Sequence, residues 1–237
     1  MASEAKRRRE ILDILAEEYR DSVSALEFGS PFQLLIATAL AAQSTDNQVN
    51  KATRDLFARY PDPQSMAGIS AEDLIPYIRS VGLYRTKAKN IAALAEMLLA
   101  DFDGVVPQTR EELTKLPGVG RKTANVVLSN AFHIPAIAVD THVFRVSNRM
   151  GLASGKTPGE VEEQLCRLIP EKDWSDAHHW LIWHGRRHCK AQRPDCGGCP
   201  VGGICPRIAL APPKAKDKGV RAARRPGNCD QGILRWL

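Results

Sequence analysis

The sequence lacks any apolar run of the roughly 18 residues that a membrane-spanning helix needs. Its N-terminus also lacks the apolar core of a secretory signal. We therefore expect a cytoplasmic protein with no membrane partner. No stretch alternates polar and apolar residues as a half-buried strand does, and this lack favours an all-helical fold. With 43% hydrophobic residues among 237, the chain still has enough apolar side chains for a real core.

The chain also has little net charge outside its C-terminal segment. Residues 207–237 hold eight Lys and Arg against two Asp, so the rest of the chain carries 25 charges of each sign. The whole formal excess of +6 therefore lies in this segment, and it suggests a polyanionic partner such as nucleic acid. Because residues 207–237 are rich in Pro, Gly and basic residues, we expect a mobile basic tail.

Apolar residues recur at helical spacing along most of the chain. A stripe over residues 11–19 predicts an amphipathic first helix, and Ser30 and Pro31 suit the cap and first position of a strongly apolar second one. Proline and glycine separate the further helices that we expect. These are Asn50–Tyr60, Ala71–Ser80, Lys87–Asp101, Arg121–Phe132, a helix capped by Asp140 and ending at Met150, Glu160–Ile169 and Ala177–Arg187.

Residues 113–132, LTKLPGVGRKTANVVLSNAF, carry the most informative motif. Pro117 cannot continue a helix and the two glycines can take positive φ, so the pattern predicts helix, hairpin, helix. The hairpin Gly118, Val119 and Gly120 leaves backbone amides with no bulky side chain in front, which favours binding of one phosphate. A Gly-x-Gly turn on its own is more often only a turn.

Lys122 is placed on the first turn of the helix that follows this hairpin. The positive end of the helix dipole disfavours a second positive charge there, so this amine loses its proton more readily than a free lysine. A neutral amine can attack carbon and form a Schiff base. The alternative is an ordinary lysine that contacts phosphate, and both roles are compatible.

Asp140 follows Lys122 by eighteen residues and is expected to cap the next helix. An ionised carboxylate near an attacking amine can stabilise cationic character on a sugar, or help to deprotonate Lys122 or a water molecule. Taken alone, an aspartate in this position is more often only a cap. The spacing from Lys122, together with the flanking motif VDTHVFR, favours a catalytic role.

Cys189, Cys196, Cys199 and Cys205 are spaced C-x6-C-x2-C-x5-C, which is typical of a metal site in a cytosolic chain. Four thiolates hold either zinc or an iron–sulfur cluster. Cys166 is expected to be a buried thiol and Cys229 lies in the tail, so the site needs neither.

The nearby histidines are more typical of core or DNA-facing groups; they are His178, His179, His184 and His188.

LPGVGRKTA followed by VDTHVFR is similar to the endonuclease III family of DNA glycosylases with lyase activity, and the resemblance extends over residues 11–206. It implies two helical lobes with a DNA-binding cleft between them. Residues 24–134 would form one lobe, and residues 1–23 with 135–206 the other. The cysteine spacing matches the 4Fe-4S loop of this family.

The resemblance also assigns DNA contacts. In AAQSTD, Gln43 would fill the gap left by an extruded base, although a polar helix end with a cap at Thr45 or Asp46 explains this loop equally well. Leu83 would be the wedge that enters a base step, with a core position as its alternative. Lys190 and Arg193, in the loop after the first cysteine, would contact phosphates, and the acidic Asp195 beside them weakens that contact.

The activity implied is the removal of oxidised pyrimidines from duplex DNA through a Lys122 Schiff base, followed by strand cleavage at the abasic site by β-elimination. We expect a monomer acting on double-stranded DNA with damaged bases or abasic sites. Two alternatives remain: an adenine-removing mismatch glycosylase, which normally lacks this lysine, and a DNA-binding protein without chemistry. The pair of Lys122 and Asp140 disfavours both.

Overall fold

The computed structural model describes residues 2–210, so most of the segment predicted to be a mobile tail lies outside it. All regular structure within this range is helical, which confirms the all-α fold. None of these helices is long and apolar enough to cross a bilayer.

The helices largely follow the predicted order. They are α1 (Ala2–Glu18), α2 (Pro31–Leu40), α3 (Asp46–Arg59), the 3-10 turn η1 (Gln64–Met66), α4 (Ala71–Ile78), α5 (Tyr84–Asp101), α6 (Arg110–Leu113), α7 (Arg121–Ala131), α8 (Thr141–Met150), α9 (Pro158–Leu168), the 3-10 turn η2 (Glu171–Asp173) and α10 (Trp174–Arg187).

Helix starts follow from side-chain caps. Ser30 accepts a hydrogen bond from the amide of Gln33 at 3.2 Å, as predicted for α2. The prediction that the next helix begins at Asn50 is wrong, because Thr45 and Gln48 form a reciprocal capping box that starts α3 at Asp46. The same kind of error occurs at α5 and α10, which each begin three residues earlier than predicted.

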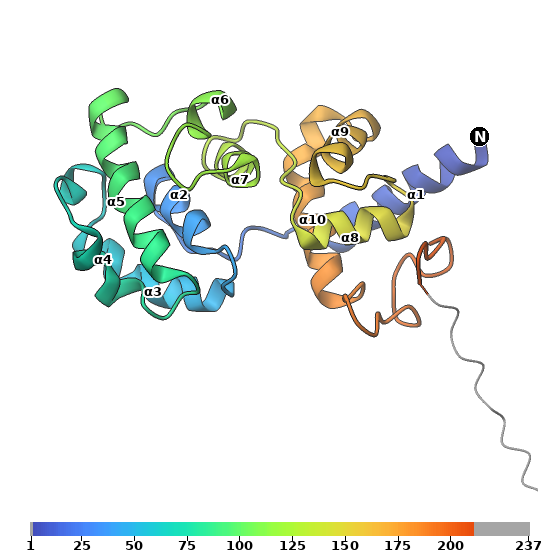
Figure 1. The fold of residues 1–237 in the computed structure, drawn as a ribbon. Helices are drawn as coiled ribbons and strands as arrows, with labels where there is room; N and C mark the ends of the chain where they lie inside the picture. The colour runs from blue at the N-terminus through green and yellow to red at the C-terminus, as the bar shows by residue number, and fades with distance from the viewer. Residues whose placement is uncertain (1, 211–237) are drawn as a thin grey trace, which may run out of the picture.

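Two separate hydrophobic cores organise the helices (Figure 1). The first lobe has a core that runs from Phe32 to Ala136 and is built from α2 to α7. The second lobe combines the apolar face of α1 with residues between Ile137 and Val201, from α8 to the loop beyond α10. The chain therefore passes between the lobes twice, once after α1 and once after α7.

A nearly buried carboxylate ties the lobes together at one side. Glu162 of α9 is 6% exposed and pairs with the Nε and Nη2 atoms of Arg121, both at 2.8 Å. It also accepts a hydrogen bond from Arg110 at 3.0 Å. A bidentate pair of this kind fixes geometry as well as charge. Because Arg121 begins α7, the second lobe holds the turn on which Lys122 is placed.

Candidate active site

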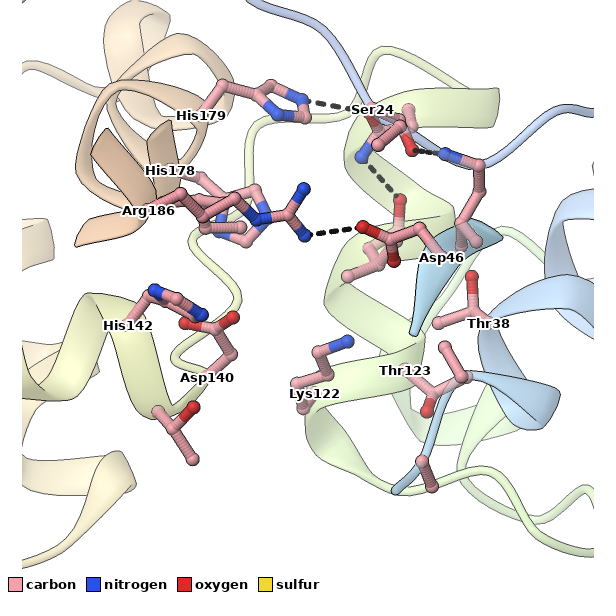
Figure 2. Close-up of a pocket in the computed structure, with 18 of the residues that line it drawn as sticks. Ser24, Thr38, Asp46, Lys122, Thr123, Asp140, His142, His178, His179 and Arg186 are labelled. Carbon is pink, nitrogen blue, oxygen red and sulfur yellow. Dashed lines mark hydrogen bonds and ion pairs between the residues drawn. The ribbon is translucent and has the colours of Figure 1, made fainter. Parts of the chain in front are cut away.

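A cleft of about 1000 Å³ opens between the two lobes. The loop 41–46 and the start of α7 line one wall, and residues 139–142 with α10 line the other (Figure 2). The segment 23–26, which connects α1 to α2, contributes a further edge. Both lobes must therefore be present for the site to exist.

Lys122 and Asp140 reach into this cleft from opposite walls (Figure 2). Lys122 is the second residue of α7, and Asp140 precedes α8. Within the described part of the chain these two side chains form no direct ion pair, so the space between them is open to a third group. The structure thus brings together the two residues that the sequence singled out.

The surroundings of Lys122 favour a neutral amine. Burial between the cleft walls lowers the pKa of Lys122, although the side chain keeps contact with water inside the cleft. The carboxylates of Asp140 and Asp46 oppose this change, whereas the guanidinium of Arg186 adds to it. Since burial is the largest effect, the amine loses its proton at a lower pH than a free lysine.

Asp140 is a helix cap as well as a cleft residue. Its Oδ1 atom accepts a hydrogen bond from the amide of Val143 at 2.8 Å, which satisfies a free donor of α8. In residues 2–210 the carboxylate makes no other hydrogen bond, so it retains acceptor capacity toward the cleft. The capping and catalytic interpretations are therefore compatible.

An ion pair crosses the cleft beside Lys122. Arg186 of α10 donates to Asp46, the first residue of α3, with 2.5 Å between Nη2 and Oδ2 (Figure 2). From the sequence, Asp46 is expected only as a helix cap, and Arg186 has no expected role. No local pattern could have found this pair, because its members are separated by 140 positions.

The histidines of α10 are wall and core groups. Burial lowers the pKa of His178 to about 3, so its imidazole is neutral. His179 also has a lowered pKa, chiefly through burial, and shares a hydrogen bond of 2.9 Å with Asn130 of α7. Both line the cleft, which agrees with the expectation of core or DNA-facing positions.

The two glycines of the hairpin between α6 and α7 have different backbone conformations. Gly118 has φ +79°, and a Cβ there would meet Asn90 at 2.9 Å. Gly120 has φ −96° and needs no left-handed backbone, so only Gly118 uses the freedom that both glycines have. A Cβ at Gly120 would meet open space, which leaves the N-terminus of α7 accessible.

The amides of this hairpin are not equivalent. The amide of Val119 donates to the Leu116 carbonyl at 3.1 Å, and its side chain is only 6% exposed. Within residues 2–210 the amides of Gly118 and Gly120 donate no hydrogen bond. Any phosphate at this turn would therefore meet the glycine amides and the first turn of α7.

Gln43 and Leu83 are presented by two adjacent turns. Each has a left-handed backbone, with φ values of 55° and 57°. Gly82 lies against the first turn, since its Cβ would come within 2.8 Å of the Gln43 carbonyl oxygen. Leu83 is 57% exposed, so the alternative that it belongs to the core is wrong. Residues held in strained backbone conformations of this kind concentrate at functional sites.

Lys87 holds the loop that presents Gln43. Its Nζ atom donates to the carbonyls of Leu40 at 2.8 Å and Ala42 at 2.5 Å, and to Ser44 Oγ at 3.3 Å. The side chain is 6% exposed, and burial lowers the pKa of Lys87. From the sequence, Lys87 begins a helix and is the alternative amine should Lys122 not be the nucleophile. Its engaged amine is poorly placed to act as a nucleophile.

Replacing Lys87 with Met is expected to lower the free energy of unfolding by about 1–3 kcal/mol, because three oxygen atoms lose a charged donor. Urea denaturation of the purified protein measures this change. Lys89→Met, two residues along the same helix and exposed, is the matched control and should leave stability nearly unchanged. Equal stability of both variants would show that Lys87 does not hold the loop.

The four clustered cysteines line one small cavity beyond α10. They are spread around it, and no three His, Cys, Asp or Glu side chains in residues 2–210 meet where one ion could touch them all. Burial raises the pKa of Cys199 to about 11, and the neighbouring thiols add to this effect. Four such thiols can ionise together only beside a cationic group.

Arg149 is hydrogen-bonded to the cysteine loop, a contact that could not be expected from the sequence. Arg149 donates to Cys189 Sγ at 3.6 Å, to the Lys190 carbonyl at 2.7 Å and to the Ala191 carbonyl at 3.0 Å. Lys190 and Arg193 are exposed on this loop. Asp195 is also exposed, but its carboxylate accepts the amide of Gly198 at 3.0 Å and so belongs to the turn of the loop itself.

Cys166 lies apart from this cavity. It is half-buried on α9 rather than fully buried, and the partial burial raises the pKa of its thiol to about 11. The expectation for Cys229 falls outside the described residues.

Comparison with known proteins gives one consistent result. A family model described as "HhH-GPD superfamily base excision DNA repair protein" matches residues 36–171. Endonuclease III of Bacillus subtilis is 50% identical over 195 residues, which cover 82% of this chain and 89% of that protein. Endonuclease III of Escherichia coli K12 is 48% identical over 199 residues, covering 84% and 94%.

Solved structures show the same relationship. A trapped endonuclease III–DNA covalent intermediate, an estranged-adenine complex, is 49% identical with a TM-score of 0.82, covering 86% of this chain and 96% of that one. A thermostable thymine-DNA glycosylase is 23% identical with a TM-score of 0.74 and shares the fold.

Proposed function

Because the chain belongs to the endonuclease III family, within the HhH-GPD superfamily of base excision repair proteins, we propose that its interlobe cleft binds a damaged nucleotide for attack by Lys122. The chain is a DNA glycosylase with AP lyase activity. The observation that carries the assignment of residues is the approach of Lys122 and Asp140 from opposite walls of the cleft.

Lys122 supplies the nucleophile in this proposal. Its neutral Nζ attacks C1′ of the deoxyribose, the bond from C1′ to the base breaks, and the base leaves. The sugar ring opens to a Schiff base with Lys122, and loss of a proton from C2′ expels the 3′ phosphate. Asp140 stabilises positive charge on the sugar during base departure.

DNA binding follows from the surfaces around the cleft. The glycine amides of the hairpin and the N-terminus of α7 hold a backbone phosphate. Leu83 enters the base stack and Gln43 occupies the space left by the extruded base, because the chemistry requires that base outside the stack. Lys190 and Arg193 add phosphate contacts from the second lobe.

The boundaries of the lobes also belong to this proposal. Residues 24–134 form one domain in this proposal, and residues 1–23 with 135–206 form the other; the first hydrophobic core reaches slightly further, to Ala136. The protein acts as a monomer, in the cytoplasm where bacterial DNA is held. Each domain supplies one of the two residues placed at the reacting sugar.

The proposed substrates are oxidised pyrimidines in duplex DNA. Incubation with duplexes containing thymine glycol, dihydrouracil or an oxidised cytosine should release the base and cut the strand. Duplexes with an adenine mispair serve as the control and should remain intact. Release of adenine alone would favour a mismatch glycosylase. Binding without cleavage of an abasic duplex would favour a DNA-binding protein without chemistry.

We further propose that Cys189, Cys196, Cys199 and Cys205 hold a 4Fe-4S cluster. Thiols spread around a shared cavity suit a cluster, in which each iron takes one thiolate, better than a single zinc ion. The bound cluster would cross-link the segment 189–205, which follows α10. Its framework would hold Lys190 and Arg193 in position.

Protein purified without oxygen is expected to contain about four iron atoms per chain. Replacing a proposed ligand, as in Cys199→Ser, should lower the iron content, because serine is a poor ligand for iron in such clusters. Cys166→Ser is the control, since Cys166 lies outside the cavity, and it should leave the iron unchanged. Elemental analysis measures the metal content of each protein. Stoichiometric zinc without iron would contradict the proposed cluster.

A further inference from the structure

Two buried side chains of the second lobe form a hydrogen-bonded chain that ends on a half-buried cysteine. Tyr19 Oη lies 3.2 Å from His184 Nδ1, and His184 Nε2 lies 3.6 Å from Cys199 Sγ. Tyr19 is 2% exposed and His184 is fully buried. Each ring nitrogen of His184 therefore has one protein partner, and water does not compete for either.

We propose that Tyr19 and His184 form a relay that tunes the reduction potential and the stability of the cluster through Cys199. The inference rests on the cluster proposed above. In the sequence Tyr19 belongs only to the apolar stripe of residues 11–19; it directly follows α1 and precedes His184 by 165 positions.

The direction of the relay follows from donor and acceptor chemistry. A thiolate bound to iron carries no proton and can only accept, so His184 must present Nε2–H to Cys199. In the tautomer that donates through Nε2, the other ring nitrogen, Nδ1, is an acceptor. The Tyr19 hydroxyl must therefore donate to it, and burial, which raises the pKa of Tyr19, keeps that proton in place. Each donor meets one acceptor in this arrangement.

A hydrogen bond to a ligand sulfur withdraws electron density from the metal centre, which makes reduction easier. It also holds the ligand in its binding orientation. Tyr19 fixes the tautomer of His184 that can donate to Cys199. The Tyr19 hydroxyl therefore affects the cluster indirectly, through His184. Arg149 gives a second hydrogen bond, to Cys189, but it also binds two loop carbonyls and is a less selective probe.

Tyr19→Phe tests the relay, because it removes one hydroxyl and keeps the packed ring. Its reduction potential is expected to fall, and a chelator should remove its iron on the order of tenfold faster than from the wild type. Tyr60→Phe, the same change in the first lobe, is the control and should match the wild type.

Two changes at His184 separate donation from packing. His184→Gln keeps a donor near the sulfur and should retain most of the wild-type potential, whereas His184→Met removes the donor and should lower it at least as far as Tyr19→Phe does. Circular dichroism confirms that each variant is folded.

The outcomes distinguish the two proposals. Iron in the wild type with an unchanged potential in Tyr19→Phe and His184→Met overturns the relay alone. Zinc in place of iron in the wild type overturns the cluster, and the relay with it.

Discussion

Lys122→Gln is expected to lower base excision and strand cleavage by about 10⁶-fold, the scale seen when an enzyme loses its nucleophile. Glutamine fits the exposed position on α7 but cannot form a Schiff base. DNA affinity should persist, because backbone amides of the hairpin rather than this amine hold the phosphate. Single-turnover assays on oxidised and abasic duplexes measure the loss.

Trapping with borohydride identifies the nucleophile directly, since it reduces the Schiff base to a stable bond between enzyme and DNA. The wild type and a Lys89→Gln control should be trapped, and Lys122→Gln should not. Lys87 is unsuited to replace the missing amine, because its Nζ is engaged by Leu40, Ala42 and Ser44. Undiminished trapping of Lys122→Gln would assign the attack to another amine.

Asp140→Asn is expected to fold normally, because asparagine also caps helices. Its rate of base excision should fall by about 10²–10⁴-fold, since the departing base leaves positive charge on the sugar without a carboxylate to stabilise it. Thermal unfolding and single-turnover excision are the two measurements. A near-normal excision rate would show that Asp140 acts only as a helix cap.

The pH dependence of trapping separates the electrostatic role of Asp140 from other effects. The carboxylate raises the pKa of Lys122, so Asp140→Asn should lower that pKa further. Trapping on a ready-made abasic site, which needs the neutral amine, should then begin at a lower pH. Asp46→Asn should shift the profile the same way and Arg186→Gln the opposite way. Profiles that coincide would show that these charges do not reach Lys122.

The parts of the site that depend on local pattern could be predicted from the sequence. The hairpin and Lys122 are adjacent in the chain, and Asp140 occupies a capping position with a known preference. The four cysteines lie within one short segment. Turn chemistry, capping and ligand spacing act over a few residues, so they can be recognised without the fold.

The parts that depend on contacts between distant segments could not be predicted. Arg186 meets Asp46, and Glu162 meets Arg121, only after the two lobes have formed. Lys87 resembles any helical lysine until the end of α2 is placed against it. The left-handed backbone at Leu83 could not be predicted either, because it lies in a turn that packs against a distant loop. Glycine is needed at position 82 because the turn contacts Gln43, and not because of the φ of Gly82 itself.

The sequence ranges of the two cores determine the order in which the lobes can fold during synthesis. All residues of the first core, up to Ala136, leave the ribosome before the residues of the second core that begin at Ile137, so the first lobe can fold early. The apolar face of α1 is made first of all, yet its partners begin only at Ile137. Until then α1 has no core to enter. When Ala136 has emerged from the ribosome, the nascent chain therefore displays a first lobe that can fold beside an amphipathic helix without a core, a form exposed to aggregation and to chaperones.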